Sequence, residues 1–287
     1  MARKLRLEFP GACYHVINRG NYRSDVFRSD KTKVAFVACL FEACAKSRWR
    51  LHAFVVMRNH YHLALETPEG NLVAGMQWLQ STFANRFNRL RAECGHLFQG
   101  RYKALLVEGG DPLALVCHYI HLNPVRAGVL SVERLRMYSA SSYSYLWRPK
   151  DRPSFLQLQW TLISTGRWAD TEAGWTAYAD YLAWQVERGP AGKSNAYVSL
   201  SQGWAVGGTE FKSALLRNHA VARDSRAWEV EGVKQVRELQ WHRALRRALA
   251  IAGKGDREIA TSPKSARWKL AVASWMKATE AVKASVK

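Results

Sequence analysis

The spacing of apolar positions changes several times along the first half of the chain, and each change predicts a new element. The run 14–19 alternates like a short strand and ends at Gly20. Asp30 provides an N-cap for a helix that follows. Two β-prone runs, 49–57 and 60–67, are separated by a short polar break and predict an antiparallel hairpin.

Helical spacing returns over 71–91, and 102–108 again reads as a strand. Asp111 and Pro112 open a further helix, which we expect to end before Pro124, because proline disfavours helical geometry in the residue before it. The order is β-α-β-β-α-β followed by a helix. It predicts an α+β fold, a ferredoxin-like sandwich with an antiparallel sheet.

A charged, proline-bearing segment at 148–153 marks a change in composition. Beyond it strand signals are few, and helical patterns cover 168–186, 233–252 and 265–286. We therefore predict two domains. Residues 1–147 form the α+β domain, and residues 148–287 form a mostly helical, basic region.

Positive charge is spread over the whole chain. Lys and Arg outnumber Asp and Glu by 43 to 23 over 287 residues, a formal net charge of +20. Both halves contribute, with 21 basic against 10 acidic residues in 1–149 and 22 against 13 in 150–287. Such an excess indicates a polyanionic partner, first of all nucleic acid. The alternative is a basic protein without a special partner.

The five cysteines show no CxxC pair, and the start MARKLRLEF has no apolar segment typical of a secretory signal. These features predict reduced thiols in a cytoplasmic protein, and a nucleic-acid partner would place it at the nucleoid. No apolar run approaches the length of a membrane span, and no basic helix with a clean apolar stripe suggests a membrane surface.

His60 and His62 are the first candidates for chemistry. Residues two apart in a strand point to the same face, so the two imidazoles would lie side by side as metal ligands. Taken alone, such a pair is more often an accident of a surface or a core. His15 in the first strand could adjoin the same site, although a role in the core is the simpler reading.

Tyr119 and Asn123 are the second candidates, because positions i and i+4 share a face of a helix. The amide oxygen of Asn123 would be a hard ligand suited to Mg²⁺ or Mn²⁺, and the hydroxyl of Tyr119 would point at whatever the metal holds. Alternatively, Tyr119 packs in the core and Asn123 caps the helix. His118 and His121 flank the tyrosine, and His121 could contact DNA.

Five segments, in this order, resemble a known family. They are YHVINRGNYRSDVF, the strand pair VVMRNHYHLALE, the overlapping motif HYHLALET, HLFQGRYKALLVE, and the helix segment YIHLNPVRAG. HYHLALET resembles the His-hydrophobic-His motif of the HUH endonuclease superfamily. YIHLNPVRAG resembles the tyrosine helix of the REP-associated tyrosine transposases, relatives of the single-tyrosine insertion-sequence transposases. The resemblance covers about residues 1–147 and is weaker over 150–287.

The resemblance implies roles by position. Tyr119 matches the catalytic tyrosine, His60 and His62 match the metal-binding histidines, and Asn123 falls at the third-ligand position, with Mg²⁺ or Mn²⁺ as the metal. It implies a single-strand DNA endonuclease and strand transferase that forms a 5′-phosphotyrosine and leaves a 3′-hydroxyl. The implied substrates are short palindromic repeats that fold into hairpins, bound by a monomer or a homodimer.

Residues that could hold the DNA lie in the loop after the first strand and near the predicted site: Arg19, Asn21, Tyr22, Arg23, Arg101, Lys103 and Arg126. The alternative for each is a solvated surface residue. Two further basic groups could form a phosphate-binding stripe in 148–287: Arg243, Arg246 and Arg247, and Lys264, Arg267 and Lys269.

Three other functions compete with the transposase-like one. A catalytically silent protein of the same ancestry would only hold hairpin DNA or RNA, but it would be free to lose His60, His62, Tyr119 or Asn123. An RNA reader would present aromatic side chains on the sheet face where this chain has histidines. A plasmid-type relaxase is disfavoured by the short length of the chain and by the sequence of the segment YIHLNPVRAG.

Overall fold

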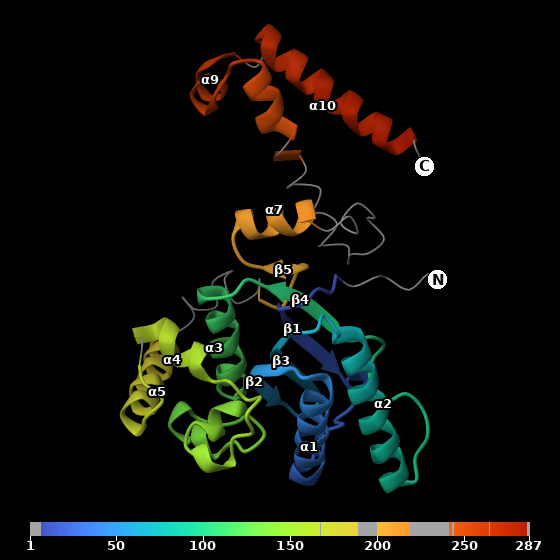
Figure 1. The fold of residues 1–287 in the computed structure, drawn as a ribbon, viewed down its shortest axis with the longest axis vertical. Helices are drawn as coiled ribbons and strands as arrows, with labels where there is room; N and C mark the ends of the chain where they lie inside the picture. Colours follow the sequence, from blue (N-terminus) through green and yellow to red (C-terminus); the bar gives the residue numbers. More distant parts are fainter. Residues whose placement is uncertain are drawn as a thin grey trace. The chain divides into compact units, whose positions relative to one another are not determined.

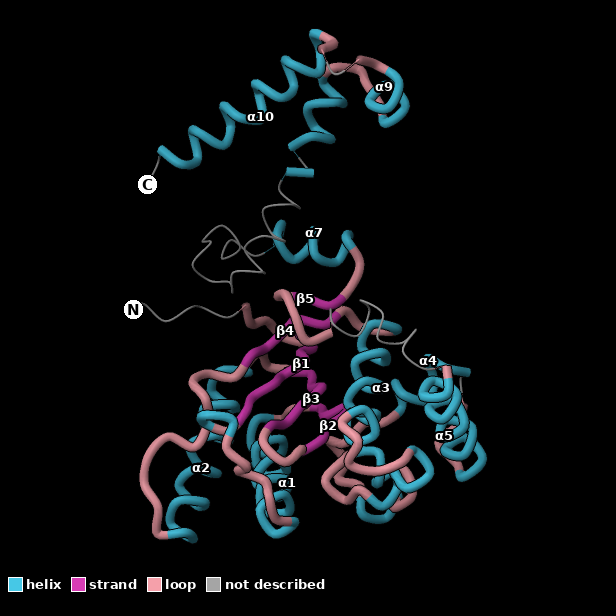
Figure 2. The backbone as a smooth tube through the Cα atoms, turned by 180° about the vertical axis from the view of Figure 1, so that it is seen from behind, coloured by secondary structure: helices cyan, strands magenta, loops and turns pink. Residues whose placement is uncertain are grey.

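The computed structural model describes residues 7–166, 168–188, 200–218, 241–242, 244–263 and 265–285. Its first part follows the predicted β-α-β-β-α-β order, and a helix comes next (Figures 1 and 2). These elements are β1 (Ala12–Arg19), α1 (Asp30–Ser47), β2 (Arg50–Val56), β3 (His60–Thr67), α2 (Leu72–Arg91), β4 (Lys103–Val107) and α3 (Asp111–Arg126).

The sheet has the strand order β2-β3-β1-β4-β5, with β1 in its centre. The pairs β2–β3, β3–β1 and β1–β4 are antiparallel, as predicted. The fifth strand, β5 (Ala205–Val206), pairs in parallel with β4 and was not expected from the sequence. In the β1–β3 register, Arg19 lies opposite His60 and Ile17 lies opposite His62, so the histidines sit at one end of the central pair.

Helices α1 and α2 cover one face of the sheet (Figure 1). On this face the ring of Phe36 from α1 lies 4.6 Å from that of Tyr61 on β3, and Phe83 from α2 lies 5.0 Å from Phe36. All three side chains are buried. Because side chains alternate along a strand, burial of Tyr61 here directs His60 and His62 to the opposite face.

Helix α3 covers that opposite face. Its residues Leu113, Val116 and Ile120 are buried against Ala64 of β3 and Leu105 of β4. The two faces together give the α+β sandwich, with α3 added over the histidine side.

Two helix boundaries differ from the prediction. The N-cap of α1 is Ser29, whose hydroxyl accepts from the backbone nitrogen of Thr32 at 3.2 Å, and Asp30 instead lies in the first turn, where it pairs with Lys33. Helix α3 does not end before Pro124 but continues to Arg126. Pro124 therefore lies in the last turn of the helix.

Part of the second half of the chain packs on α3 rather than standing apart. Helices α4 (Gln159–Gly166) and α5 (Glu172–Glu187) lie beside it (Figure 2), reached through the short 3-10 turns Val132–Met137, Ser142–Tyr145 and Pro149–Asp151. The chain divides into two compact units, Met1–Lys212 and Ser213–Lys287. The structural division thus falls later than 147/148, whereas the functional division predicted there stays a prediction.

The second unit contains α9 (Asp256–Thr261) and α10 (Arg267–Ser285), and α7 (Thr209–Asn218) spans the boundary between the units. Ala248, Val272 and Met276 form a small apolar core. The ammonium of Lys269 donates to the backbone oxygens of Ile259 and Ser262, so this residue of the predicted stripe serves the local fold. Arg243, Lys264 and residues 233–240 of the predicted helical run 233–252 lie outside the described residues.

Within the described residues, none of the helices combines the length and apolar character needed to span a bilayer. The five cysteines, which all lie in this part of the chain, are free thiols.

Candidate active site

The pair of histidines predicted from the strand pattern lies together on β3. The ring centroids of His60 and His62 are 5.1 Å apart, and both rings face the α3 side of the sheet. His62 is buried, and His60 is partly exposed at the strand's beginning. The site therefore has a closed end at His62 and an open end at His60.

His15 fixes the proton of His62. The carbonyl oxygen of Leu200 lies 2.6 Å from Nδ1 of His15, so this nitrogen carries the hydrogen and donates it. Burial lowers the pKa of His15 to about 4, so the ring is neutral at pH 7 and its Nε2 can only accept. That Nε2 lies 3.0 Å from Nδ1 of His62, which therefore donates. We assign the remaining nitrogen of His62, Nε2, as the one with a lone pair.

The same logic applies to His60. Its Nδ1 lies 2.7 Å from the amide oxygen of Asn59, so Nδ1 is the protonated nitrogen and Nε2 keeps its lone pair. Burial lowers the pKa of the His60 ring, the charge of Arg19 lowers it further, and the side chain of Asn123, from α3, acts in the opposite direction. A strand and a helix that are far apart in sequence thus meet at this ring.

Tyr119 comes to the same place from α3. Its ring centroid is 5.5 Å from that of His62 and 5.8 Å from that of His15, both in edge-on contact. The continuation of α3 beyond Pro124 keeps Asn123 inside the helix, four residues after Tyr119 and on the same face. The structure therefore brings together all four residues predicted from the two motifs, with the tyrosine helix docked on the sheet.

Buried hydrogen bonds hold the side of α3 that carries His118 and His121. The hydroxyl of Ser142 donates to the carbonyl of Phe54 at 3.2 Å and accepts from Nε2 of His121 at 2.8 Å. Because Nε2 of His121 then carries the proton, Nδ1 of the same ring accepts from the Tyr178 hydroxyl. The Tyr178 oxygen, 2.9 Å from Nδ1 of His118, then accepts from that ring. The expectation that His121 contacts DNA is wrong, because its side chain is fully buried.

The charges around the histidines are positive. Burial is the main reason why the pKa of His62 lies well below its ordinary value, and neighbouring His15, His60, Arg19 and Arg126 lower it further. The guanidinium carbon of Arg126 lies 5.0 Å from the centre of the Tyr119 ring. No carboxylate of the described residues is among the groups that shift the pKa of His60 or His62. The site is thus suited to an anionic ligand such as a phosphodiester.

The other predicted DNA contacts are placed as follows. Lys103 begins β4 next to the site, where its charge helps to lower the pKa of His15. Asn21, Tyr22 and Arg23 form a 3-10 turn directly after β1, and the Tyr22 side chain is 92% exposed. Arg101 lies exposed in the loop before β4. An exposed tyrosine ring beside cationic side chains is a suitable surface for an unpaired base.

Two imidazole nitrogens and an amide oxygen are donors that fit a divalent cation, because the hydrogen bonds at both Nδ1 atoms leave Nε2 lone pairs. Neutral donors next to two arginines make a weak site by themselves. Such a cation would depend on phosphate oxygens for much of its charge compensation. One other group of His, Cys and Glu side chains in the described part of the chain is close enough to share an ion: Cys13, His52 and Glu66.

Fold and site together define a class of protein, in which a helix presents a tyrosine to a histidine pair on an antiparallel sheet. Residues 9–123 match the family described as "Transposase IS200 like", a range that begins before β1 and ends at Asn123. The match covers less than half of the chain. The match includes His60, His62 and Tyr119.

Solved structures give weaker likenesses. One is a REP-associated tyrosine transposase bound to a REP hairpin, with 15% identity, a TM-score of 0.44, and coverage of 53% of this chain and 89% of that one. Another is described as a transposase from Deinococcus radiodurans R1, with 20% identity, a TM-score of 0.30, and coverage of 45% and 91%. A comparison with curated proteins found no match.

The contact between His15 and His62 leads to a testable expectation. Replacing His15 by leucine removes the acceptor that fixes the His62 proton, so we expect the affinity for Mn²⁺ to fall about tenfold to a hundredfold. His15→Gln, which can both donate and accept, should recover part of the loss. Equal Mn²⁺ requirements in both variants and the wild type would show that His15 only fills space.

Proposed function

We propose that this protein is a metal-dependent, single-strand DNA endonuclease and strand transferase that uses Tyr119 as its nucleophile. The observation that carries the proposal is the edge-on contact between the rings of Tyr119 and His62, with the side chain of Asn123 near enough to His60 to influence the pKa of its ring. A buried structural tyrosine would not need a histidine pair with lone pairs directed by two separate hydrogen bonds. The match of residues 9–123 to the IS200-like transposase family supports it.

In the proposed reaction, the Tyr119 oxygen attacks the phosphorus of a phosphodiester. The bond between phosphorus and the 3′ oxygen breaks, the phenol gives up its proton, and the 3′ oxygen takes one up. The product is a 5′-phosphotyrosine and a free 3′-hydroxyl. Because the phosphodiester energy is kept in the covalent link, a 3′-hydroxyl elsewhere can reverse the step and join strands without ATP.

A tyrosine hydroxyl with an ordinary pKa of about 10 is a poor nucleophile at neutral pH. Mg²⁺ or Mn²⁺ held by His60, His62 and Asn123 would polarise the phosphate and stabilise developing charge. Arg19 and Arg126 would bind the non-bridging oxygens and hold the scissile strand in line with Tyr119. The neutral state of His62 keeps it available as a ligand over the physiological pH range.

The proposed substrate is hairpin-forming palindromic DNA with a single-stranded foot. Support comes from the net charge of +20 and from the exposed Tyr22 beside Arg23, in a turn that continues the strand carrying Arg19. Arg101 and Lys103 would hold the same strand from the β4 side. We propose that the protein acts in the cytoplasm at the nucleoid, as a monomer or a homodimer.

The proposal is tested by incubating the full chain with hairpin-bearing single-stranded DNA, with Mg²⁺ or Mn²⁺ and with EDTA. A protein–DNA adduct that survives denaturation and vanishes in EDTA is expected. The second candidate is a protein that only binds hairpin DNA or RNA, and the basic surface allows it. Hairpin binding without any adduct would favour that candidate.

The neutral donors and flanking arginines predict that metal and DNA bind together. In the Tyr119→Phe variant, which keeps DNA uncut, the affinity for Mn²⁺ should rise about tenfold or more when hairpin DNA is present, measured by electron paramagnetic resonance. The control is the same variant with His60→Ala and His62→Ala added, where the increase should disappear. Equal Mn²⁺ affinity with and without DNA would argue against a shared site.

A further inference from the structure

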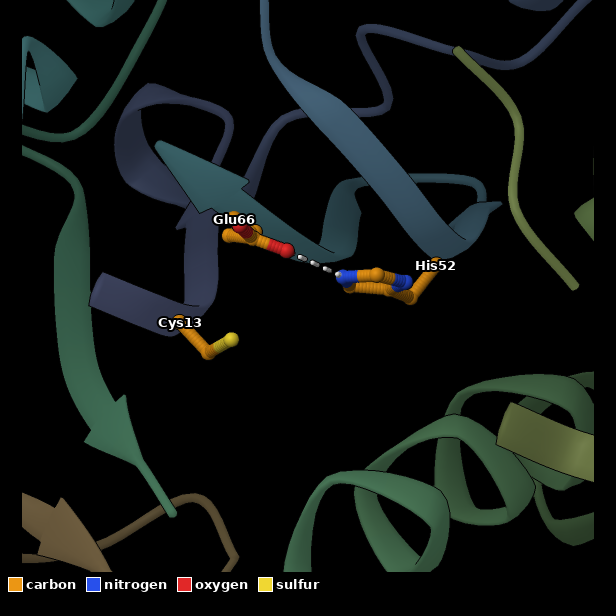
Figure 3. A group of neighbouring side chains, drawn as sticks. All are labelled: Cys13, His52 and Glu66. Carbon is orange, nitrogen blue, oxygen red and sulfur yellow. Dashed lines mark ion pairs between the residues drawn. The ribbon is translucent and has the colours of Figure 1, made fainter. Parts of the chain in front are cut away.

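A second group of ligand-type side chains lies on the same sheet face as the histidine pair. Cys13 of β1, His52 of β2 and Glu66 of β3 each offer one atom, and these atoms lie within 4.8 Å of one another. Figure 3 shows the three side chains directed toward one another from three neighbouring strands. Cys13 and Glu66 are direct partners in the β1–β3 register.

The backbone explains why His52 joins this group. The β2–β3 pairing shifts between Leu51 and Ala53, so His52 is the extra residue of a bulge and is turned toward Glu66. Bulges of this kind redirect single side chains, and they weaken the ladder locally.

His52 is 1% exposed, and one of its nitrogens lacks a hydrogen-bond partner. Its Nδ1 lies 3.3 Å from the carbonyl oxygen of Gln157, so Nδ1 is the donor. Its Nε2 has no hydrogen-bond partner among the described residues, and the nearest carboxylate oxygen, Oε2 of Glu66, is 3.7 Å away. A buried polar atom left in this way is costly unless something else binds it.

Glu66 and Cys13 complete the donor set. Arg50 holds Oε1 of Glu66 at 2.9 Å, which orients the carboxylate and leaves Oε2 facing His52. Cys13 is half-buried, and burial together with the charge of Glu66 raises the pKa of its thiol to about 12. A cation between them would offset both effects, since it stabilises a thiolate and a carboxylate at once.

We propose that Cys13, His52 and Glu66 form a binding site for a transition-metal ion of the Zn²⁺ type. Sulfur and imidazole nitrogen beside one carboxylate suit Zn²⁺ rather than Mg²⁺. With Zn–N and Zn–O bonds of about 2.1 Å, two ligands of a tetrahedral ion lie roughly 3.4 Å apart. The 3.7 Å between Nε2 of His52 and Oε2 of Glu66 is near that value.

This site is distinct from the proposed catalytic one. Glu66 is four residues after His62 on β3, which corresponds to roughly 13 Å along the strand. An ion here would cross-link β1, β2 and β3 and stabilise the sheet that carries His60 and His62. Its role would be structural, and it would be needed whether or not the protein cuts DNA.

Co²⁺ is the probe, because a thiolate bound to cobalt gives a charge-transfer absorption band. The metal-stripped full chain is titrated with Co²⁺, then with Zn²⁺ to displace it. One equivalent with a charge-transfer band is expected, lost in Cys13→Ser and His52→Gln and kept in Cys94→Ser, a matched exposed thiol. The band should also persist in the His60→Ala, His62→Ala double variant.

Glu66→Gln keeps the shape of the side chain and should raise the dissociation constant about tenfold or more. Absence of a charge-transfer band in the wild type would overturn the proposal, and this result does not depend on how any variant folds. A band that survives Cys13→Ser would overturn it as well. Either result would leave His52 and Glu66 as an ordinary pair without a metal ion.

Discussion

Replacement of Tyr119 by phenylalanine is expected to abolish the covalent adduct with hairpin-bearing DNA and to lower cleavage by roughly a thousandfold or more. The change removes the attacking oxygen and keeps the ring that lies against His62 and His15. DNA affinity should therefore change by no more than about twofold, since Arg19 and Arg126 are untouched. Adduct formation is measured on denaturing gels and DNA affinity by fluorescence anisotropy.

Tyr145→Phe is the matched control, because this half-buried tyrosine packs on Phe41 and Phe54, away from the histidine pair. It should form the adduct like the wild type. If Tyr119→Phe still forms a denaturation-resistant adduct, another side chain is the nucleophile. If neither the wild type nor Tyr119→Phe forms an adduct while both bind the hairpin, the proposed tyrosine mechanism is wrong.

Acidification from pH 7 to pH 5 is expected to lower the free energy of unfolding by about 4 kcal/mol through two buried histidines of α3, His118 and His121. Burial lowers the pKa of His118 to about 4 and that of His121 to about 3. The unfolded chain binds protons at these rings below about pH 6.5, whereas the folded protein does not until much lower pH. Stability is therefore lost as the pH falls below about 6.5, at about 2 kcal/mol for each histidine at pH 5.

The measurement is urea unfolding at a series of pH values. His121→Gln should remove about 2 kcal/mol of the dependence, although it also weakens the hydrogen bonds to Tyr178 and Ser142 at every pH. His96→Gln, on an exposed loop, is the matched substitution at the surface. Equal stability of the wild type at pH 7 and pH 5 would mean that these rings are protonated in the folded protein.

The element order could be predicted from the sequence because each strand and helix of the first half has its own periodicity. The buried positions Met76, Leu79 and Phe83 of α2 follow directly from the 3.6-residue repeat. The two-residue strand β5 could not be predicted, because so short a segment has no period and depends on pairing with β4. The predicted end of α3 was wrong because the preference for non-helical geometry before Pro124 is outweighed by the packing of α3 on the sheet.

The four site residues came from spacing and from the family resemblance, and the structure adds the residues that orient them. Nothing in the sequence near His15 indicates that Leu200, 185 positions later, holds its ring. Nor does any local pattern link His118 and His121 to Tyr178. These are contacts between distant segments, and spacing within one element carries no information about them.

The hydrogen bond from His15 to the carbonyl of Leu200 limits where the chain can be truncated without changing the site. The oxygen belongs to a segment more than fifty residues beyond the end of the nuclease-like sequence, yet it determines which nitrogen of His62 bears the proton. A shortened chain that stops at residue 147 would keep every residue of the two motifs and lose this anchor. The smallest interchangeable module therefore extends through β5, and grafts of new DNA-binding regions should be joined after Val206.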